Sequence, residues 1–482
     1  MPTAQQPETT ATRPDLVRAL NVWHAAALVV GIIIGSGIFL VPKRMMAAAG
    51  SVELVFLAWI VGGLLSWFGA LSYAELGALK PGSGGEYVYI RDAYGPQAGF
   101  LYAWTTFLIS KPASIATVAA GVVRIMGEFG PLAFMQKEIG GGITVGHLVA
   151  CFFIIFFSIL NYLGVKKAGD FHLFFTILKV AMIVAIIGIG FAYTQGGPHN
   201  FKTSYPQAMG GMAGFMAALI AALWAYDGWN NVLMVAGEIR EPQRNIPKAL
   251  IYGITAVAVL YIGTSLAVQW VLPSAEIALA DRPASLAVMR VIGPVGAMVI
   301  SAGIGFSMFV TINGQILAGA RVPYAAARDG YFFAPVARVH PIFHTPSVAI
   351  AFQAALTIFL IIVGGKFEDL FNLAIYAEWL FYMVAASTVF VFRKREPDVP
   401  RAYKTWGYPV VPVLFILAAL VLLVYSFYQG LHPALQAMPF SQWPSLAAGT
   451  LFLKSNSFWG TVVILAGMPV FWYFSRRGAL SR

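Results

Sequence analysis

Long apolar runs, separated by short polar segments, recur along the whole 482-residue chain. About twelve of them are long enough to cross the roughly 30 Å of a bilayer's hydrocarbon as helices. Backbone groups in lipid have no water to bond, so such segments have to be helical. The approximate limits of the runs are Leu20–Val41, Leu54–Leu79, Tyr94–Val123, Ile143–Tyr162, Phe171–Tyr193, Met209–Gly237, Ile246–Val271, Val295–Ala320, Ser347–Gly364, Phe367–Phe392, Tyr408–Tyr428 and Ser457–Phe474. The pattern predicts an all-α integral membrane protein.

Two of these runs contain residues that interrupt a helix. The first run holds Gly35-Ser36-Gly37 near its middle, and the sixth holds Trp224–Asn231, with a charge, a glycine and two asparagines. Glycine weakens a helix, and lipid offers no water to repair the freed backbone groups. Small residues at a tight helix interface are the plainer explanation of the first site. They do not explain Asp227, because an unpaired charge at that depth is costly.

The two interrupted runs stand at corresponding positions of two five-helix halves, residues 20–194 and 195–395. Interrupted segments placed in this way indicate an inverted-repeat transporter whose site lies between them. Because five is odd, the second half enters the membrane from the opposite side. The sequence therefore predicts a five-plus-five inverted repeat in which the first and sixth helices are discontinuous. Residues 396–482 then supply two additional helices, with an extracellular loop at 431–456 and a short cytoplasmic C-terminus.

The breaks also indicate a chemistry. A half-helix that begins inside the membrane presents free N–H groups and a positive dipole end, which suit a carboxylate. Free carbonyls where another half-helix ends suit an ammonium group. An amino acid needs both, about one residue length apart.

The composition narrows the class of protein further. Charged residues make up 11% of the chain, against about a quarter in a soluble domain. A single cysteine, Cys151, excludes an intrachain disulfide. The sequence has no Cys/His cluster with metal-ligand spacing and no phosphate-binding glycine loop in a strand-turn-helix setting. We therefore expect a protein that is not an enzyme and has no metal or cofactor.

The net charge of +11 does not indicate a nucleic-acid partner, because the basic residues lie in short loops between apolar runs. With the N-terminus inside, the inner segments hold about twice as many Lys and Arg residues as the outer segments. This asymmetry predicts a multi-pass protein of the inner or plasma membrane with both termini in the cytoplasm. Residues 1–19 are expected to be a cytoplasmic tail.

The motifs at and around the breaks resemble the L-type amino acid transporter family of the amino acid–polyamine–organocation superfamily. The resemblance spans roughly residues 18–395. The matching stretches are Gly31–Phe39, Tyr73–Gly77, Pro81–Tyr89, Trp224–Asn230, Glu238–Pro247, Asn313–Gln315, Ala318–Gly330 and Glu378–Tyr382. The family implies a five-plus-five core with two extra helices and sodium-independent amino acid transport, often by exchange.

The resemblance also implies a substrate site. The backbone N–H groups of Gly35, Ser36 and Gly37 would bind the substrate carboxylate. Ile33 and Trp224 would offer carbonyls to its amine, and Trp224 would be an aromatic gate over the substrate. Asp227, where other members have a glycine, and Gly228 complete this predicted substrate-binding set.

Two lysines and two glutamates inside the apolar runs suggest further roles in coupling, in the cavity or in ion pairs. Lys179 lies deep in the fifth run, where the family implies that its ammonium replaces a sodium ion and ties the first helix to Ser307 and Thr311. Lys111 is expected either to line the cavity or to pair with Glu378, and Asn313 is a further cavity candidate. Glu75 is expected to form a structural ion pair near Arg91 at the cytoplasmic mouth.

We thus predict a sodium-independent exchanger or uniporter of neutral L-amino acids that works by alternating access. A carrier of cationic amino acids or polyamines, with Asp227 as counter-charge, is one alternative. An amino acid receptor that binds without transport is another. The expected partners are the amino acid and the lipid bilayer, with the protein acting as a homodimer or without an obligate partner, and with no nucleic acid.

Overall fold

Two of the apolar runs are divided into separate helices. In the computed structural model, which describes residues 15–127, 130–363, 367–436 and 456–480, α1 (Val22–Ile33) is followed by α2 (Gly37–Ala49). Likewise, α9 (Gly211–Ala225) is followed by the short α10 (Asn231–Met234) and a 3-10 turn, η4 (Ala236–Glu238). Both divisions fall where the glycines and polar residues of the sequence predict an interruption.

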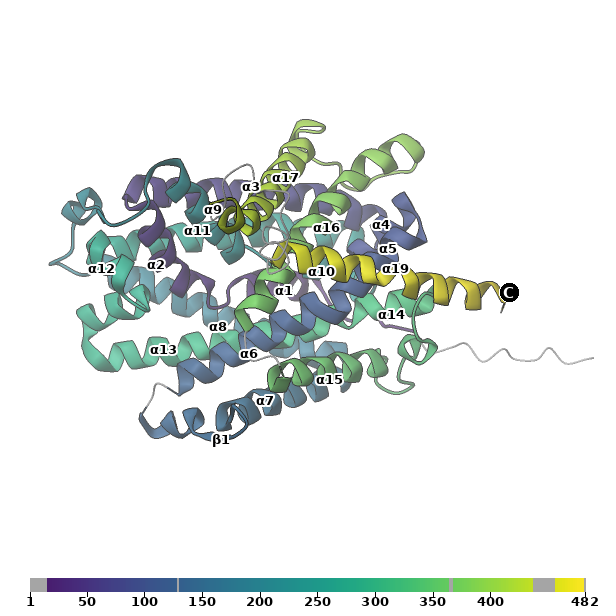
Figure 1. Cartoon of the computed structure of the whole chain (residues 1–482), viewed down its shortest axis with the longest axis horizontal. Coiled ribbons are helices and arrows are strands. Elements are labelled where there is room, and N and C mark those ends of the chain that lie inside the picture. Colours follow the sequence, from purple (N-terminus) through teal and green to yellow (C-terminus); the bar gives the residue numbers. More distant parts are fainter. Residues whose placement is uncertain (1–14, 128–129, 364–366, 437–455, 481–482) are drawn as a thin grey trace, which may run out of the picture.

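The other helices follow the remaining apolar runs. They are α3 (Val52–Leu79), α4 (Glu86–Tyr94), α5 (Pro96–Thr105), α6 (Lys111–Met126), α7 (Val145–Tyr162), α8 (Val165–Phe191), α11 (Pro242–Val271), α12 (Ser274–Leu279), α13 (Pro283–Gly319), α14 (Arg321–Arg328), α15 (Ser347–Val363), α16 (Phe367–Arg395), α17 (Val410–Gln436) and α19 (Asn456–Leu480). Single 3-10 turns are η2 (Gly130–Gln136), η3 (Pro198–Lys202) and η5 (Ala334–Ala337). Most of these helices run roughly along the long axis of the molecule (Figure 1).

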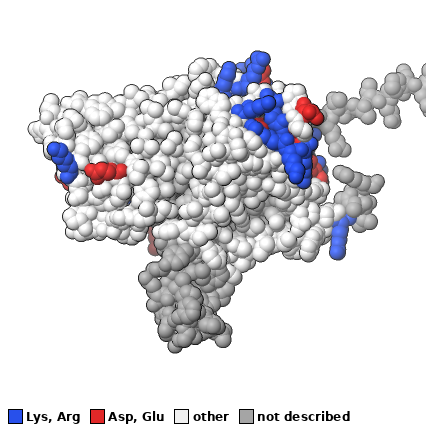
Figure 2. Space-filling view, turned by 90° about the horizontal axis from the view of Figure 1, so that it is seen from above, with Lys and Arg blue, Asp and Glu red and all other residues white. Residues whose placement is uncertain are grey.

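The lengths and surfaces of the helices are those of a multi-span membrane protein. Within the described residues, 8 helices are long and apolar enough to cross a membrane, and four further apolar helices are shorter. In Figure 2 a broad face without charged side chains lies between a large group of Lys and Arg at one end and a small charged group at the other. A surface of this kind is stable against lipid and not against water. The prediction of a helical, multi-pass membrane protein is confirmed.

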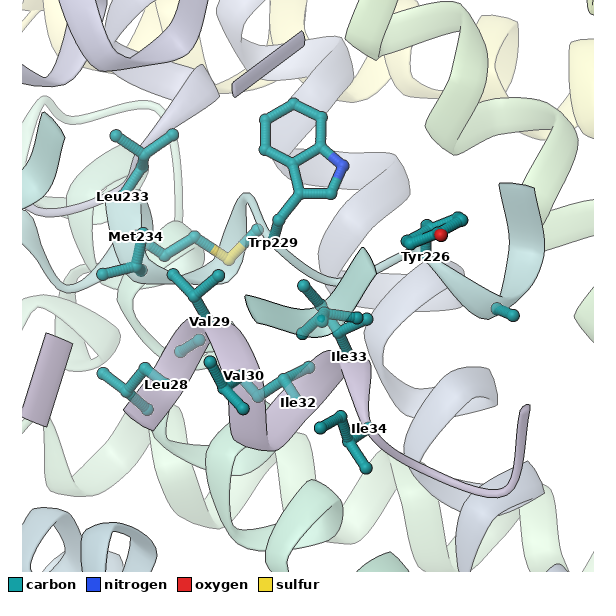
Figure 3. Packing of buried hydrophobic residues seen from close by; sticks show 14 of the residues in the cluster. Leu28, Val29, Val30, Ile32, Ile33, Ile34, Tyr226, Trp229, Leu233 and Met234 are labelled. Atoms are coloured by element: carbon teal, nitrogen blue, oxygen red, sulfur yellow. The ribbon is translucent and has the colours of Figure 1, made fainter. Parts of the chain in front are cut away.

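The interrupted helices lie in the middle of the bundle. Helix α11 packs against α1, α3 and α8, while α2 packs against α9. In Figure 3 the apolar side chains of α1, from Leu28 to Ile34, face those of the Tyr226–Met234 segment. Ile34 and Tyr226 are completely buried. Packing of apolar side chains thus holds the two breaks against each other.

Three expectations about the elements need correction. The third run is not one continuous α-helix, because a π-helical turn, η1 (Thr106–Ser110), separates α5 from α6. A short antiparallel hairpin, β1 (Glu138–Gly140) and β2 (Ile143–Thr144), makes the described chain not purely helical. The loop expected at 431–456 begins later, because α17 continues to Gln436. Residues 437–455 of that expected loop lie outside the described part of the chain.

Glu75 forms a structural ion pair as expected, but its partner is Arg393 and not Arg91. The Glu75 carboxylate accepts hydrogen bonds from Nε and Nη2 of Arg393, at 2.9 and 2.7 Å, and from the backbone N–H of Thr405 at 2.7 Å. Arg91 instead pairs with Asp329 and Asp92. Closeness in sequence did not predict the partner, because α3 and α4 turn these two side chains toward different neighbours.

The end of the bundle opposite α12 is closed by a buried ion pair. The Arg321 guanidinium donates from Nε and Nη2 to the two oxygens of Glu238, at 2.7 and 3.0 Å, and both side chains are 0% exposed. The backbone of Leu20 bonds on either side of Ile239, donating to the carbonyl of Glu238 and accepting from the N–H of Arg240. The segment before α1 is thereby joined to the segment after α10.

We expect Arg321→Met to be strongly destabilising. It leaves the Glu238 carboxylate buried without its cation, which typically costs about 3–5 kcal/mol. Thermal unfolding in detergent should show a clearly lower midpoint. Arg290→Met is the matched control, since the pair of Arg290 with Glu276 is part-exposed and worth about 0–1 kcal/mol. Adding Glu238→Leu to Arg321→Met should recover much of the loss. Equal midpoints for the two single variants would contradict this role.

Candidate substrate site

The break between α1 and α2 exposes backbone at the centre of the bundle. The chain turns at Ile34, and the N–H of Gly35 bonds back to the carbonyl of Ile33 at 2.8 Å. The first N–H groups of α2 have no carbonyl one turn earlier to bond. A Cβ at Gly37 would lie only 3.1 Å from Cα of Ala225. Glycine there lets α2 lie against the end of α9, so its amide face is not covered by a side chain.

The second break lies directly opposite the first. Between α9 and α10, Gly228 adopts φ +106°, a region that favours glycine. A Cβ at this position would approach Cγ2 of Ile32 to 2.8 Å. The turn therefore ends α9 close to α1.

A tyrosine that the sequence analysis did not single out joins the two breaks. The hydroxyl of Tyr261, on α11, lies 2.9 Å from the carbonyl of Ile33 and 3.0 Å from that of Ala225. The single hydroxyl hydrogen of Tyr261 can be donated to one of these two carbonyls at a time, and the Ile33 carbonyl also accepts from the N–H of Gly35. The offer of the Ile33 carbonyl to a substrate amine stays a prediction. The sequence feature that points to Tyr261 is a phenol hydroxyl in the middle of an apolar run, because such a group needs a hydrogen-bond partner.

Lys179 of α8 holds the end of α1. Its ammonium donates to the carbonyls of Gly31, Ile34 and Ser307 at 2.8, 2.7 and 3.0 Å, and its side chain is 2% exposed. The expected tie to Ser307 is made through its carbonyl, and the described contacts include no bond from Lys179 to Thr311. The hydroxyls of Ser307 and Thr311 donate to the same α1 carbonyls, at 2.9 and 3.3 Å. The lysine and the two hydroxyls of α13 together satisfy the carbonyls that the break frees.

A cavity of about 430 Å³ lies against both breaks, a size typical of small-molecule sites. It extends from the breaks toward Arg44 and Arg124, away from the closed end at Arg321. Its lining residues are Ile32, Ile33, Gly35, Ser36, Gly37, Leu40, Arg44, Ser114, Thr117, Val118, Ala120, Gly121, Arg124, Ile125, Trp224, Ala225, Asp227, Met308, Thr311, Gln315 and Glu378.

Several predicted site residues lie outside this lining. Gly228 acts through the backbone turn, and Lys179 and Ser307 lie behind α1. Asn313 is not a cavity residue: its amide bonds to Asn161 on α7 and to the carbonyl of Ala168 on α8. Asn313 was predicted because it belongs to a matching motif. The position of a residue in a motif does not show which neighbouring helix its side chain contacts.

Lys111 pairs with Glu378 rather than lining the cavity. The ammonium lies 3.4 Å from Oε1 of Glu378, and the two side chains are 5% and 17% exposed. Lys111 is the first residue after the π-helical turn η1, a feature frequent at functional sites. The sequence feature that points to this π-helical turn is Pro112, the next residue.

A chain of buried polar side chains runs from the cavity into the bundle. The hydroxyl of Tyr382 on α16 lies 2.8 Å from Oδ1 of Asp227 and 3.0 Å from Oδ1 of Asn230. The Asn230 amide in turn donates to Glu86, which also accepts from Tyr102 at 3.0 Å. Burial raises the pKa of the Glu86 carboxyl, which lies on α4 outside the counted spans, while the Asn230 bond lowers it. Glu86 was not among the site residues predicted from the sequence.

The geometry identifies a class of protein. Two interrupted helices meet at a cavity, where the half-helix α2 begins and the half-helix α9 ends, and this is the arrangement of secondary transporters. Within the described ranges, no cluster of three or more His, Cys, Asp or Glu residues could hold a metal. The chemistry offered is recognition of a small dipolar solute.

Comparison with known proteins gives the family. The amino acid permease family matches residues 20–453, so the chain belongs to this family. It is 32% identical to the serine/threonine exchanger of Bacillus subtilis (strain 168), over 96% of this chain and 98% of the relative. It is 31% identical to the human b(0,+)-type amino acid transporter 1, over 87% and 84% of the two chains. It is 29% identical to the human cystine/glutamate transporter, over 95% and 86%.

These findings confirm the resemblance to L-type transporters of the amino acid–polyamine–organocation superfamily. The protein is an amino acid transporter and not an enzyme.

Proposed function

We propose that this transporter carries neutral L-amino acids by exchange or uniport, without sodium. The observation that carries the proposal is the cavity bounded by the start of α2 and the end of α9. The substrate carboxylate would bind the N–H groups of Ser36 and Gly37, since the N–H of Gly35 already donates to the Ile33 carbonyl. The ammonium would bind the carbonyls of Ile33 and Trp224 and the Asp227 carboxylate. Trp224 would close over the substrate.

Alternating access follows from an inverted repeat. We propose that residues 20–194 and 195–395 are the two halves, and that residues 396–482 add two helices. The Lys and Arg residues gathered at one end of the molecule (Figure 2) support a cytoplasmic position for that end and for both termini, in an inner or plasma membrane. The cavity, which extends away from that end, would then face outward while the Arg321–Glu238 pair closes the inner side.

Uptake into proteoliposomes tests this function. Vesicles loaded with unlabelled L-leucine or L-alanine should accumulate the same labelled amino acid, and a large excess over empty vesicles would indicate exchange. Labelled amino acid that binds the protein but never enters vesicles would overturn the proposal in favour of a receptor. Stronger competition by arginine or putrescine than by leucine or alanine would favour a cationic substrate. Asp227 and Glu378, the two carboxylates of the cavity lining, are the feature that would support that alternative.

We expect Asp227→Asn to lower the transport of neutral amino acids by about tenfold or more. The change removes the charge that faces the substrate ammonium, and a hydrogen bond to a charged group is worth about 1.5–3 kcal/mol. Asparagine keeps the ability to cap a helix and to accept from Tyr382, so a merely structural role would be preserved. Uptake by Asp227→Asn should be compared with uptake by Glu276→Gln, which changes an exposed carboxylate. Unchanged uptake in Asp227→Asn would exclude the electrostatic role.

A further inference from the structure

The polar chain behind the cavity has too few hydrogens for its contacts. The Tyr382 hydroxyl has one hydrogen but lies 2.8 Å from Oδ1 of Asp227 and 3.0 Å from Oδ1 of Asn230. Both contacts are at hydrogen-bond distance, so one of them needs a hydrogen from another source.

The orientation of the Asn230 amide determines where that hydrogen can come from. Its Nδ2 donates to Oε1 of Glu86, and its Oδ1 accepts from Nδ2 of Asn231 at 3.3 Å. Turning the amide over would place two donors against each other at Asn231. It would also set two oxygens in contact at Glu86 unless that carboxyl carried a proton. Only the first orientation satisfies every contact, and it does so when the Asp227 carboxyl is protonated, donates to the Tyr382 oxygen and leaves the Tyr382 hydrogen for Asn230.

The charges of the same region lead independently to the same conclusion. Asp227, Glu378 and Glu86 are three carboxylates, and Lys111 is the cation that the described contacts place beside them. Arg44 and Arg124 line the same cavity as Asp227 and Glu378 but form no described ion pair with them. The other titratable groups that face them are the phenols of Tyr73, Tyr89, Tyr102 and Tyr382. Phenols compensate no negative charge, and several uncompensated carboxylates in a buried region favour proton uptake.

We propose that the empty transporter binds one proton on the Asp227–Tyr382–Asn230–Glu86 chain and that the ammonium of an incoming amino acid displaces it. This inference rests on the proposed function. Asp227 borders the cavity, so its O–H bond can break with the proton passing to cavity water. The carboxylate left behind pairs with the substrate ammonium.

The displacement has a thermodynamic consequence. An ammonium near Asp227 favours the ionised carboxyl, so substrate and proton weaken each other's binding by the same factor. The amino acid should therefore bind more tightly as the pH rises, by about tenfold per pH unit while the site is protonated.

The first experiment uses the purified full-length transporter in detergent with L-alanine as the probe. In weakly buffered solution with a pH-indicator dye, saturating L-alanine should release about one proton per transporter. The dissociation constant measured at several pH values should show the predicted slope on the acid side. Binding of L-alanine with no proton release and a pH-independent dissociation constant would overturn the proton site and leave the proposed function intact.

The second experiment needs no substrate. Infrared spectra of the empty protein should contain the C=O band of a protonated carboxylic acid that disappears in alkaline buffer. Asp227→Asn should remove this band, whereas Glu276→Gln, at an exposed carboxylate, should leave it. Thermal unfolding shows which variants are folded, and the band of the wild-type protein decides the question if Asp227→Asn does not fold. If no amino acid binds, the proposed function fails, and the infrared band still reports whether the proton is present. Absence of the band from the wild-type protein would overturn the proposal.

Discussion

Lys179→Ala should reduce transport by more than about tenfold while leaving membrane insertion and expression unchanged. The ammonium makes three hydrogen bonds to carbonyls, two of them at the end of α1. Each bond to a charged group contributes about 1.5–3 kcal/mol, so their loss releases the break that shapes the site. A sodium ion would need the same oxygens, and two cations cannot share them at contact distance. Wild-type uptake should therefore be unchanged when choline replaces external sodium.

The matched control for this prediction is Lys167→Ala, which removes an exposed lysine from the same helix, α8. Its uptake should equal that of the wild type. Two results would contradict the role assigned to Lys179: wild-type turnover in Lys179→Ala, or loss of wild-type uptake in choline.

Gly37→Val should abolish substrate binding, whereas Ser36→Ala should retain most of it. A Cβ at Gly37 already meets the backbone of Ala225 at 3.1 Å, and the larger valine side chain would push α2 away from α9. The N–H groups that we expect to bind the carboxylate would then be displaced or covered. Ser36 makes no side-chain cap of α2 in the described structure, so its hydroxyl can be removed with the backbone in place. Binding of a labelled amino acid to purified protein measures both effects.

A control substitution at a second glycine distinguishes this steric effect from a general cost of placing valine in a membrane helix. Gly188 lies on α8, and a Cβ added there would meet no neighbouring atom of the described chain within 4 Å. Gly188→Val should therefore bind substrate as the wild type does. If Ser36→Ala and Gly37→Val lose binding equally, the substrate is held by the serine hydroxyl and not by the backbone.

The sequence alone predicted the features that depend on depth in the membrane. An apolar run of sufficient length has to be helical in lipid, so the multi-span helical class followed from the runs. Glycines or a carboxylate in the middle of a run interrupt the helix, and no water is present in lipid to bond the freed backbone groups. This reasoning placed both breaks correctly, at Gly35–Gly37 and at Asp227–Gly228. Lys179 was identified in the same way, because a charged side chain deep in the membrane needs oxygen atoms around it.

Only the tertiary structure decided which side chains meet. Position along a helix determines depth, but the face that a residue turns to a neighbour depends on how helices pack. Glu75 therefore pairs with Arg393, 318 residues away, rather than with the nearer Arg91, and Asn313 lies between α7 and α8 instead of at the cavity. The Tyr261 bridge and the chain from Asp227 to Glu86 also join separate helices. Such contacts form because buried polar groups must find partners wherever packing brings them together, and spacing within one run does not contain that information.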